Sequence, residues 1–198
     1  GQVITLDSAN AMTGAVSITH TGSANVEIDN GTTALNLGTV GVGQDFQATS
    51  GGVISDSGVI TVARNATFIT DVNDIDIVLD SDNAITGAIN ITTQTGGSNG
   101  ADVTIDNGTT AINLGTVTAR GNLSVRGGAG ITDSGVITVS GTSLFHSDVS
   151  GQVITLDSVN AMTGAVSITH TGAANVAIDN GTTALNLGTV SVGQNFQA

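Results

Sequence analysis

The feature that most constrains this chain is a segment that occurs twice, almost letter for letter. Residues 1–48 return as residues 151–198 with five differences, at positions 9/159, 23/173, 27/177, 41/191 and 45/195. A looser copy lies near the midpoint between them, because NGTTALNLGTV at Asn30 and Asn180 matches NGTTAINLGTV at Asn107. A near-regular repeat of this kind predicts a stack of similar structural units.

This spacing predicts one continuous unit over residues 1–198, with repeats at about 1–73, 74–150 and 151–198, the last one truncated. The chain stops within a unit and starts without Met. We therefore expect it to be a fragment of a longer array.

A shorter period lies inside the long one. A strand that ends in Ile or Leu and runs into a polar turn recurs at nearly even intervals, at Leu6, Ile28, Ile54, Leu79, Ile105, Ile131, Leu156 and Ile178. Apolar residues alternate with polar ones within each unit, which is typical of strands with one buried face. The prediction is an all-β fold, a parallel β-solenoid of about eight coils of 22–26 residues, with three coils in each ~75-residue repeat.

Composition agrees with this fold and excludes two classes of partner. The chain has no Pro, which suits strands that are paired on both sides and need every backbone N–H. The formal charge of −13 argues against nucleic-acid binding, which depends on Lys and Arg. No apolar run approaches the roughly 20 residues of a membrane span.

Eight Asp residues stand one or two positions after the recurring Ile or Leu. We expect them to line one corner of the solenoid and to accept backbone N–H bonds in the turns. They are Asp7, Asp29, Asp56, Asp80, Asp106, Asp133, Asp157 and Asp179.

A second hypothesis for the acidic residues is a Ca²⁺-binding edge, since carboxylates stacked about 5 Å apart repel one another unless a cation neutralises them. Calcium is the one cofactor that the sequence suggests, and the chain requires no other. The densest acidic segment is DVNDIDIVLDSD, and its candidate ligands are Asp71, Asp74, Asp76, Asp80 and Asp82.

Six Asn residues begin an N-x-S/T sequence. Turn chemistry accounts for the three Asn-Gly-Thr cases, and glycosylation is the alternative, which would fit a surface protein. The six are Asn30, Asn65, Asn90, Asn107, Asn122 and Asn180.

We expect no enzyme activity. The loops between the predicted strands are short, and no serine triad or phosphate-binding loop is recognisable. The four Phe residues take core positions in the repeat, and His20, His146 and His170 lack a second metal ligand at suitable spacing, so we expect these histidines at the surface.

The phrases ITDSGVITVSG, AINLGTVTARGNLSVRGGAG and ALNLGTV resemble the repeat regions of very large bacterial surface exoproteins, namely the filamentous-haemagglutinin-like proteins and the β-strand-repeat adhesins. The resemblance covers the whole chain and is one of repeat style. It implies a right-handed β-helical shaft that is exported across the outer membrane and is displayed on the bacterial cell surface or released.

Two functions follow as expectations. The first is a structural shaft in a secreted or cell-surface adhesin, filament or extracellular matrix fibre, whose partners are the neighbouring repeats of the same chain and other copies in a bundle. The alternative is a solenoid module that binds Ca²⁺ or a glycan and mediates contact with another cell or a surface.

Overall fold

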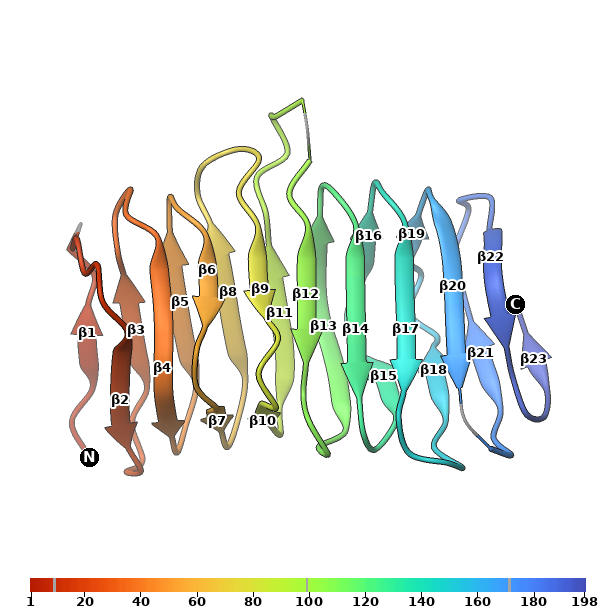
Figure 1. Cartoon of the computed structure of the whole chain (residues 1–198), viewed down its shortest axis with the longest axis horizontal. Helices are drawn as coiled ribbons and strands as arrows, with labels where there is room; N and C mark the ends of the chain where they lie inside the picture. Colours follow the sequence, from red (N-terminus) through yellow and green to blue (C-terminus); the bar gives the residue numbers. More distant parts are fainter. Residues whose placement is uncertain (9, 99, 171) are drawn as a thin grey trace.

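The structure is a computed structural model that describes residues 1–8, 10–98, 100–170 and 172–198. These residues form a parallel β-solenoid of about nine turns, and the described part contains no helix. The chain winds between two long faces, and within each face all strands run parallel (Figure 1). The predicted fold class is confirmed.

Face 1 is a twelve-stranded sheet. Its strands are β1 (Ile4–Leu6), β3 (Val26–Asp29), β5 (Phe46–Ser50), β8 (Ala66–Thr70), β11 (Ala88–Thr92), β13 (Ile112–Ala119), β15 (Ile131–Asp133), β16 (Ile137–Val139), β18 (Ile154–Leu156), β19 (Ala161–Met162), β21 (Val176–Ile178) and β23 (Phe196–Gln197).

Face 2 is an eleven-stranded sheet. Its strands are β2 (Val16–His20), β4 (Leu35–Val42), β6 (Ile54–Asp56), β7 (Ile60–Val62), β9 (Ile77–Leu79), β10 (Ala84–Ile85), β12 (Val103–Asp106), β14 (Leu123–Gly127), β17 (Ser143–Ser147), β20 (Ala165–His170) and β22 (Asn186–Ser191). Two strands from one turn can share a face, as β6 and β7 both pair with β4.

The length of chain in one turn of the solenoid varies. The step from Ile112 to its partner Ile131 is among the shortest, and the step from Ile91 to Val117 is among the longest. The core between the faces is built from inward-facing Val, Ile, Leu and Phe, which form one continuous cluster from β3 to β21. The rings of Phe46 and Phe68 meet edge to face, with their centroids 5.9 Å apart.

The outward positions are the ones that changed between the two near-identical copies. Glu27 on β3 is exposed, and its counterpart Ala177 on β21 is half-buried. The pairs 23/173, 41/191 and 45/195 are likewise exposed or half-buried. In the fifth pair Val159 is exposed and position 9 lies outside the described residues, so every described change avoids the core.

Each long repeat spans three and a half turns, rather than the three that the sequence predicts. The ALNLGTV segment of the first repeat forms β4 on face 2, and its counterpart in the middle repeat forms β13 on face 1. The third copy returns to face 2 as β22. The sequence count fails because the recurring Ile or Leu lies now on one face and now on the other, as Ile28 pairs with Ala48 and Ile54 pairs with Leu35.

The three copies reproduce the same irregularity although they lie on alternate faces. The register shifts within the pairs β2–β4, β11–β13 and β20–β22, so that two residues of one strand oppose one residue of the other. At β13 the extra N–H, on Thr116, donates to Asn90 Oδ1 at 3.1 Å, and at β22 Thr189 N donates to Ser167 Oγ at 3.1 Å. The bulge is therefore specified by the repeat and not by the face.

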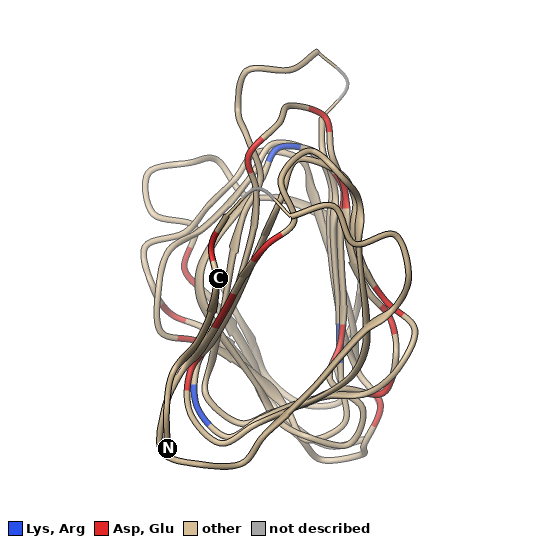
Figure 2. Cartoon of the chain, turned by 90° about the vertical axis from the view of Figure 1, so that its left-hand side faces the viewer, with Lys and Arg blue, Asp and Glu red and all other residues tan. Residues whose placement is uncertain are grey.

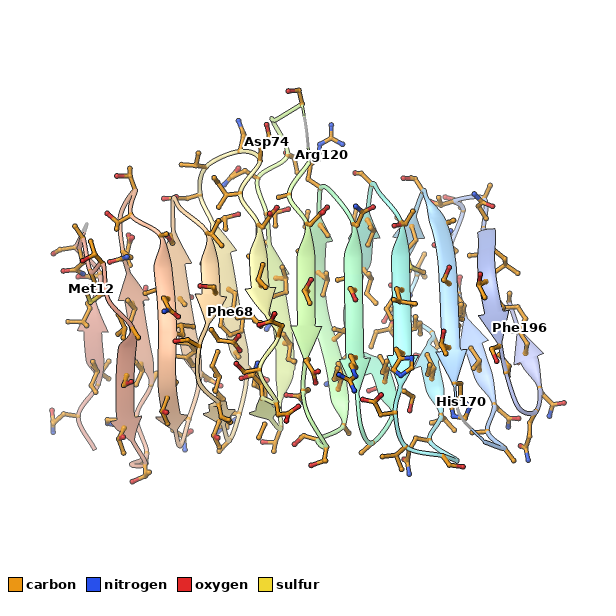
Figure 3. All side chains as sticks on the ribbon, viewed as in Figure 1. Met12, Phe68, Asp74, Arg120, His170 and Phe196 are labelled. Atoms are coloured by element: carbon orange, nitrogen blue, oxygen red, sulfur yellow. The ribbon has the colours of Figure 1, made fainter. Side chains whose placement is uncertain are left out.

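The end view shows acidic residues on both long sides of the section and at its upper end (Figure 2). Side chains project from the strands along the whole length of the rod (Figure 3), and the inward-facing ones form the core. Within the described ranges, the structure has no helix of the length and hydropathy that a membrane crossing requires.

Candidate functional site

The eight Asp residues of the predicted corner do not lie in one column. Those on face 1 end or follow its strands: Asp7, Asp29, Asp133, Asp157 and Asp179. Asp56, Asp80 and Asp106 do the same on face 2. The prediction of a single corner is wrong because one repeat spans three and a half turns. The same motif in the next repeat therefore lies on the opposite face.

The predicted role of these Asp side chains, acceptance of backbone N–H bonds, is present on both faces. Asp29 and Asp106 each accept from the N–H two residues later, Gly31 at 2.7 Å and Gly108 at 2.8 Å. Such Asx turns redirect the chain at the end of a strand.

The best developed of these networks surrounds Asp56, which is only 9% exposed. Its Oδ1 accepts the N–H groups of Asp80 at 3.0 Å and Ser81 at 3.2 Å, both in the next turn. Its Oδ2 accepts Asn83 Nδ2 at 2.6 Å, and Asn83 Oδ1 in turn accepts Ile60 N at 2.7 Å. Burial raises the pKa of Asp56 above its ordinary value, and these hydrogen bonds oppose the shift only in part.

The same network recurs on the opposite face around Asp133. Its Oδ1 accepts Asp157 N at 2.9 Å and Ser158 N at 3.2 Å, and its Oδ2 accepts Asn160 Nδ2 at 2.8 Å. Asn160 Oδ1 accepts Ile137 N at 2.8 Å. Each network links adjacent turns at a point where a strand is interrupted. Its hydrogen bonds therefore hold one turn of the solenoid on the next.

Three of the six predicted glycosylation positions are buried. Asn30 and Asn107 have no exposed surface, and Asn180 is 6% exposed. The Nδ2 of Asn107, the atom that would carry a glycan, donates to the carbonyl oxygens of Ile85 at 3.0 Å and Ala111 at 2.9 Å. The folded rod therefore leaves no room for a glycan at these three Asn-Gly-Thr sites, where the side chain replaces a backbone pairing partner.

The other three positions keep glycosylation as a prediction. Asn65 and Asn122 are exposed, and Asn90 is half-buried. Asn65 Oδ1 accepts Ala88 N at 3.0 Å, and Asn122 Oδ1 accepts Thr142 N at 2.9 Å, so both also take part in linking one turn to the next.

The five candidate calcium ligands are divided between the two ends of β9. Asp71, Asp74 and Asp76 precede the strand, and Asp80 and Asp82 follow it. In the part of the chain that the structure describes, no group of three or more His, Cys, Asp or Glu side chains is arranged to hold a metal ion. The geometry thus gives no support to the calcium site.

Two of these carboxylates instead hold a protruding loop. Asp74 Oδ1 accepts Gly100 N at 3.0 Å, and Asp74 Oδ2 accepts Ser98 N at 3.2 Å. Asp76 Oδ1 accepts Asp102 N at 2.8 Å. Asp74 has a φ of 60°, where its counterpart Gly151 has a φ of 82°, so the middle repeat uses an Asp in a left-handed position to supply the carboxylate.

Sequence reasoning missed an ionic cluster on face 2. Arg126 Nε lies 2.7 Å from Asp148 Oδ2, its Nη1 lies 3.3 Å from Asp106 Oδ2, and His146 Nε2 lies 2.8 Å from Asp148 Oδ1. The strand register places Asp106, Arg126 and His146 side by side. Burial alone would raise the pKa of Asp148, but the bonds from Arg126 and His146 lower it below its ordinary value.

One of the three histidines does not lie at the surface. His170 is only 5% exposed, and its Nε2 contacts the carbonyl oxygen of Gln152. Its counterpart His20 is half-buried, with Nε2 2.8 Å from Gln2 O. The surface prediction is wrong for His170 because this position faces the preceding turn and not the solvent.

Comparison with known proteins agrees with the repeat period. The family model "Repeats of unknown function (DUF5649)" matches residues 23–92 and 100–169, and the starts of these two segments are separated by the same step as Asn30 and Asn107. No curated protein and no solved structure matches the chain significantly.

Proposed function

We propose that this chain, which belongs to the DUF5649 family of repeats, is a structural shaft segment of a large secreted or cell-surface bacterial protein of the adhesin or filament type. Its task is to supply length and stiffness. The observation that carries the proposal is the continuous core, because each turn buries its apolar residues against the turns before and after it.

The polar side chains support the same function. The networks of Asp56 and Asp133 and the buried Asn107 link one turn to the next. Because these links recur on both faces, repeats can be added without a change in the way that turns stack. The resemblance to large exoprotein repeats supports a place outside the cell, where such a rod would carry a recognition domain away from the surface.

Electron microscopy of proteins with two, four and six repeats tests the shaft. At about 4.8 Å per turn, each pair of repeats should add about 34 Å to the length of the particle at constant width. Compact particles whose width grows with repeat number would contradict the proposal. Antibody labelling of intact bacteria tests the surface location separately.

A further inference from the structure

The middle repeat has a longer loop, which the shaft function does not require. Thr93 stands where His20 stands in the first repeat, and Asp102 stands where Asn25 stands, so the loop between them is four residues longer in the middle repeat. This loop, between β11 and β12, rises above the rest of the rod and lies beside the β8–β9 loop (Figure 1). Loops held on a rigid scaffold commonly carry binding residues.

The longer loop is held by matching residues in the preceding turn. Asn73 Oδ1 accepts Gly96 N at 3.1 Å, in addition to the bonds that Asp74 and Asp76 accept from the loop. The equivalent residues elsewhere in the chain are Ser150, Gly151 and Val153, and the last two have no side-chain acceptor. The middle repeat therefore has both a longer loop and the side chains that hold it. The presence of both changes in one repeat indicates that the loop has a defined conformation.

A polar groove of about 250 Å³ lies at the foot of this loop. Its lining residues are Ser98, Gly100, Asp102, Arg120, Gly121, Asn122, Ser140 and Gly141. Gly121 and Gly141 stack directly, since Gly141 N donates to Gly121 O at 2.8 Å. Arg120 and Ser140 directly precede these glycines, and Asp102 Oδ1 lies against Gly121, 2.3 Å from where a Cβ would stand.

The first repeat carries long side chains at the positions of these two glycines. Gln44 and Arg64 occupy the positions of Gly121 and Gly141, and Arg64 Nη1 donates to Gln44 Oε1 at 3.3 Å. The middle repeat has lost both side chains. It has instead gained Arg120 where the first repeat has Gly43, and Arg120 Nε donates to Thr95 O in the loop at 3.2 Å. Figure 3 shows Arg120 beside the protrusion.

We propose that this groove is a binding site for a neutral saccharide. Hydroxyl groups both donate and accept, so a sugar ring can use a guanidinium donor and a carboxylate acceptor at once, and Arg120 and Asp102 supply this pair. The hydroxyls of Ser98 and Ser140 add further partners, whereas the Asn122 amide is already bonded to Asp102 Oδ1 at 3.1 Å and to Thr142 N at 2.9 Å. The formal charge of −13 disfavours an anionic ligand.

The groove is small and open, so one site should bind weakly, with a dissociation constant in the millimolar range. In an array, the same edge of the rod would present the site once every seven turns, about 34 Å apart. Regular spacing of weak sites raises the overall affinity for a polysaccharide without new contacts. This proposal goes beyond the shaft function, because a rod with an empty groove would still supply length.

The test is an amide ¹H–¹⁵N NMR titration of the 198-residue chain with maltotetraose, cellotetraose and mannotetraose. Tetragalacturonate and tetraglutamate are the acidic comparisons. At least one neutral oligosaccharide should shift the amide signals of Ser98, Gly121 and Gly141 in a saturable way. Arg120→Gln should weaken that binding at least tenfold, and Ser140→Trp, which fills the groove at an exposed position, should abolish it.

Two control variants lie in the first repeat. Arg64→Gln removes another exposed guanidinium, and Ala63→Trp adds the same indole at the position equivalent to Ser140, away from the proposed site, so both should bind as the unmodified chain does. The site is refuted if no neutral oligosaccharide moves these amides at millimolar concentration, or if Arg120→Gln and Ser140→Trp both bind normally. Equal or tighter binding of either acidic probe would overturn the assignment to neutral sugars. Each of these outcomes leaves the length test of the shaft unaffected.

Discussion

At the scale of single residues, buried amide side chains replace missing backbone groups. Asn107 Oδ1 accepts Ile85 N at 2.9 Å while its Nδ2 donates to Ile85 O, which is the pairing that a peptide group would make. Asn30 and Asn180 make the same pair with Met12 and Met162. A side-chain amide suits this position because it offers a carbonyl acceptor and N–H donors together, as a peptide group does.

We therefore expect Asn107→Ala to destabilise the rod strongly. The change leaves the N–H and C=O of Ile85 and the C=O of Ala111 without this partner, at a cost of about 2–4 kcal/mol in the free energy of unfolding. Urea denaturation followed by circular dichroism measures the loss. Asn65→Ala, at an exposed position, serves as the control and should cost less than about 1 kcal/mol. Equal losses would show that the buried amide has no special role.

Asp56 gives a pH-dependent prediction. Because burial raises its pKa in the folded state, the folded protein binds this proton more tightly than the unfolded chain does. Its contribution to stability is therefore fully present below the unfolded pKa and is lost as the pH rises through the folded pKa. A ¹³C NMR titration of the Asp carboxyl groups should place Asp56 above the ordinary Asp value of 3.8 and Asp148 below it. A low pKa for Asp56 would contradict the burial of its carboxyl group.

At the scale of elements, a strand in this fold is defined by the two turns that flank it. Leu37 on β4 has no exposed surface and is in register with Val16 of the preceding turn and Asp56 of the next. Residues in register on successive turns form a column. A substitution at Leu37 therefore affects the packing of its own turn and of the two turns beside it.

Leu37→Asp should break this column, because an unpaired charge in an apolar interior is costly. We expect loss of cooperative unfolding in urea, measured by circular dichroism. Leu37→Ala, which keeps the residue apolar, should lower the free energy of unfolding by about 2–5 kcal/mol. Thr39→Asp, on the exposed side of the same strand, is the control and should change little. A folded Leu37→Asp variant of normal stability would show that the residue does not face the core.

At the scale of the whole molecule, the half-turn in each repeat makes the rod two-sided. Consecutive repeats present the same surface to opposite sides, and the original orientation returns after two repeats, or seven turns. The two nearly identical segments, 1–48 and 151–198, therefore have the same orientation in the rod. Duplication of a pair of repeats preserves the side of every residue, whereas duplication of a single repeat inverts it.

Distances between spin labels test this arrangement, and the chain has no Cys to interfere. Labels at residues 27 and 177, on one face, should lie about 34 Å apart along the rod. The 47/132 pair shares a face across four turns and should give about 19 Å. The 27/104 pair, three and a half turns apart but on opposite faces, should give a longer distance than 47/132. A shorter one would mean that every repeat keeps its face.

The sequence by itself determined the fold class and the facing of the residues. Alternation of apolar and polar residues, the lack of Pro and a recurring polar turn leave few alternatives to a parallel solenoid. The alternation also predicts which side of a strand is buried, and the apolar Leu37 lies in the core while Glu27 is exposed. These signals are local, since each depends on residues within one strand and its turn. The Asx turns at Asp29 and Asp106 are predictable for the same reason.

Only the tertiary structure decided which strands are neighbours. Sequence periodicity reports that a motif returns, but not whether the chain has completed a whole number of turns, and the same strand pattern buries equally well on either face. That ambiguity placed all eight turn Asp residues in one column, grouped five acidic residues, Asp80 among them, as calcium ligands and left Asn107 available for a glycan. The register of Ile28 with Ala48 resolves it, because hydrogen bonding between turns depends on the length of the intervening coil and not on the identity of the motif.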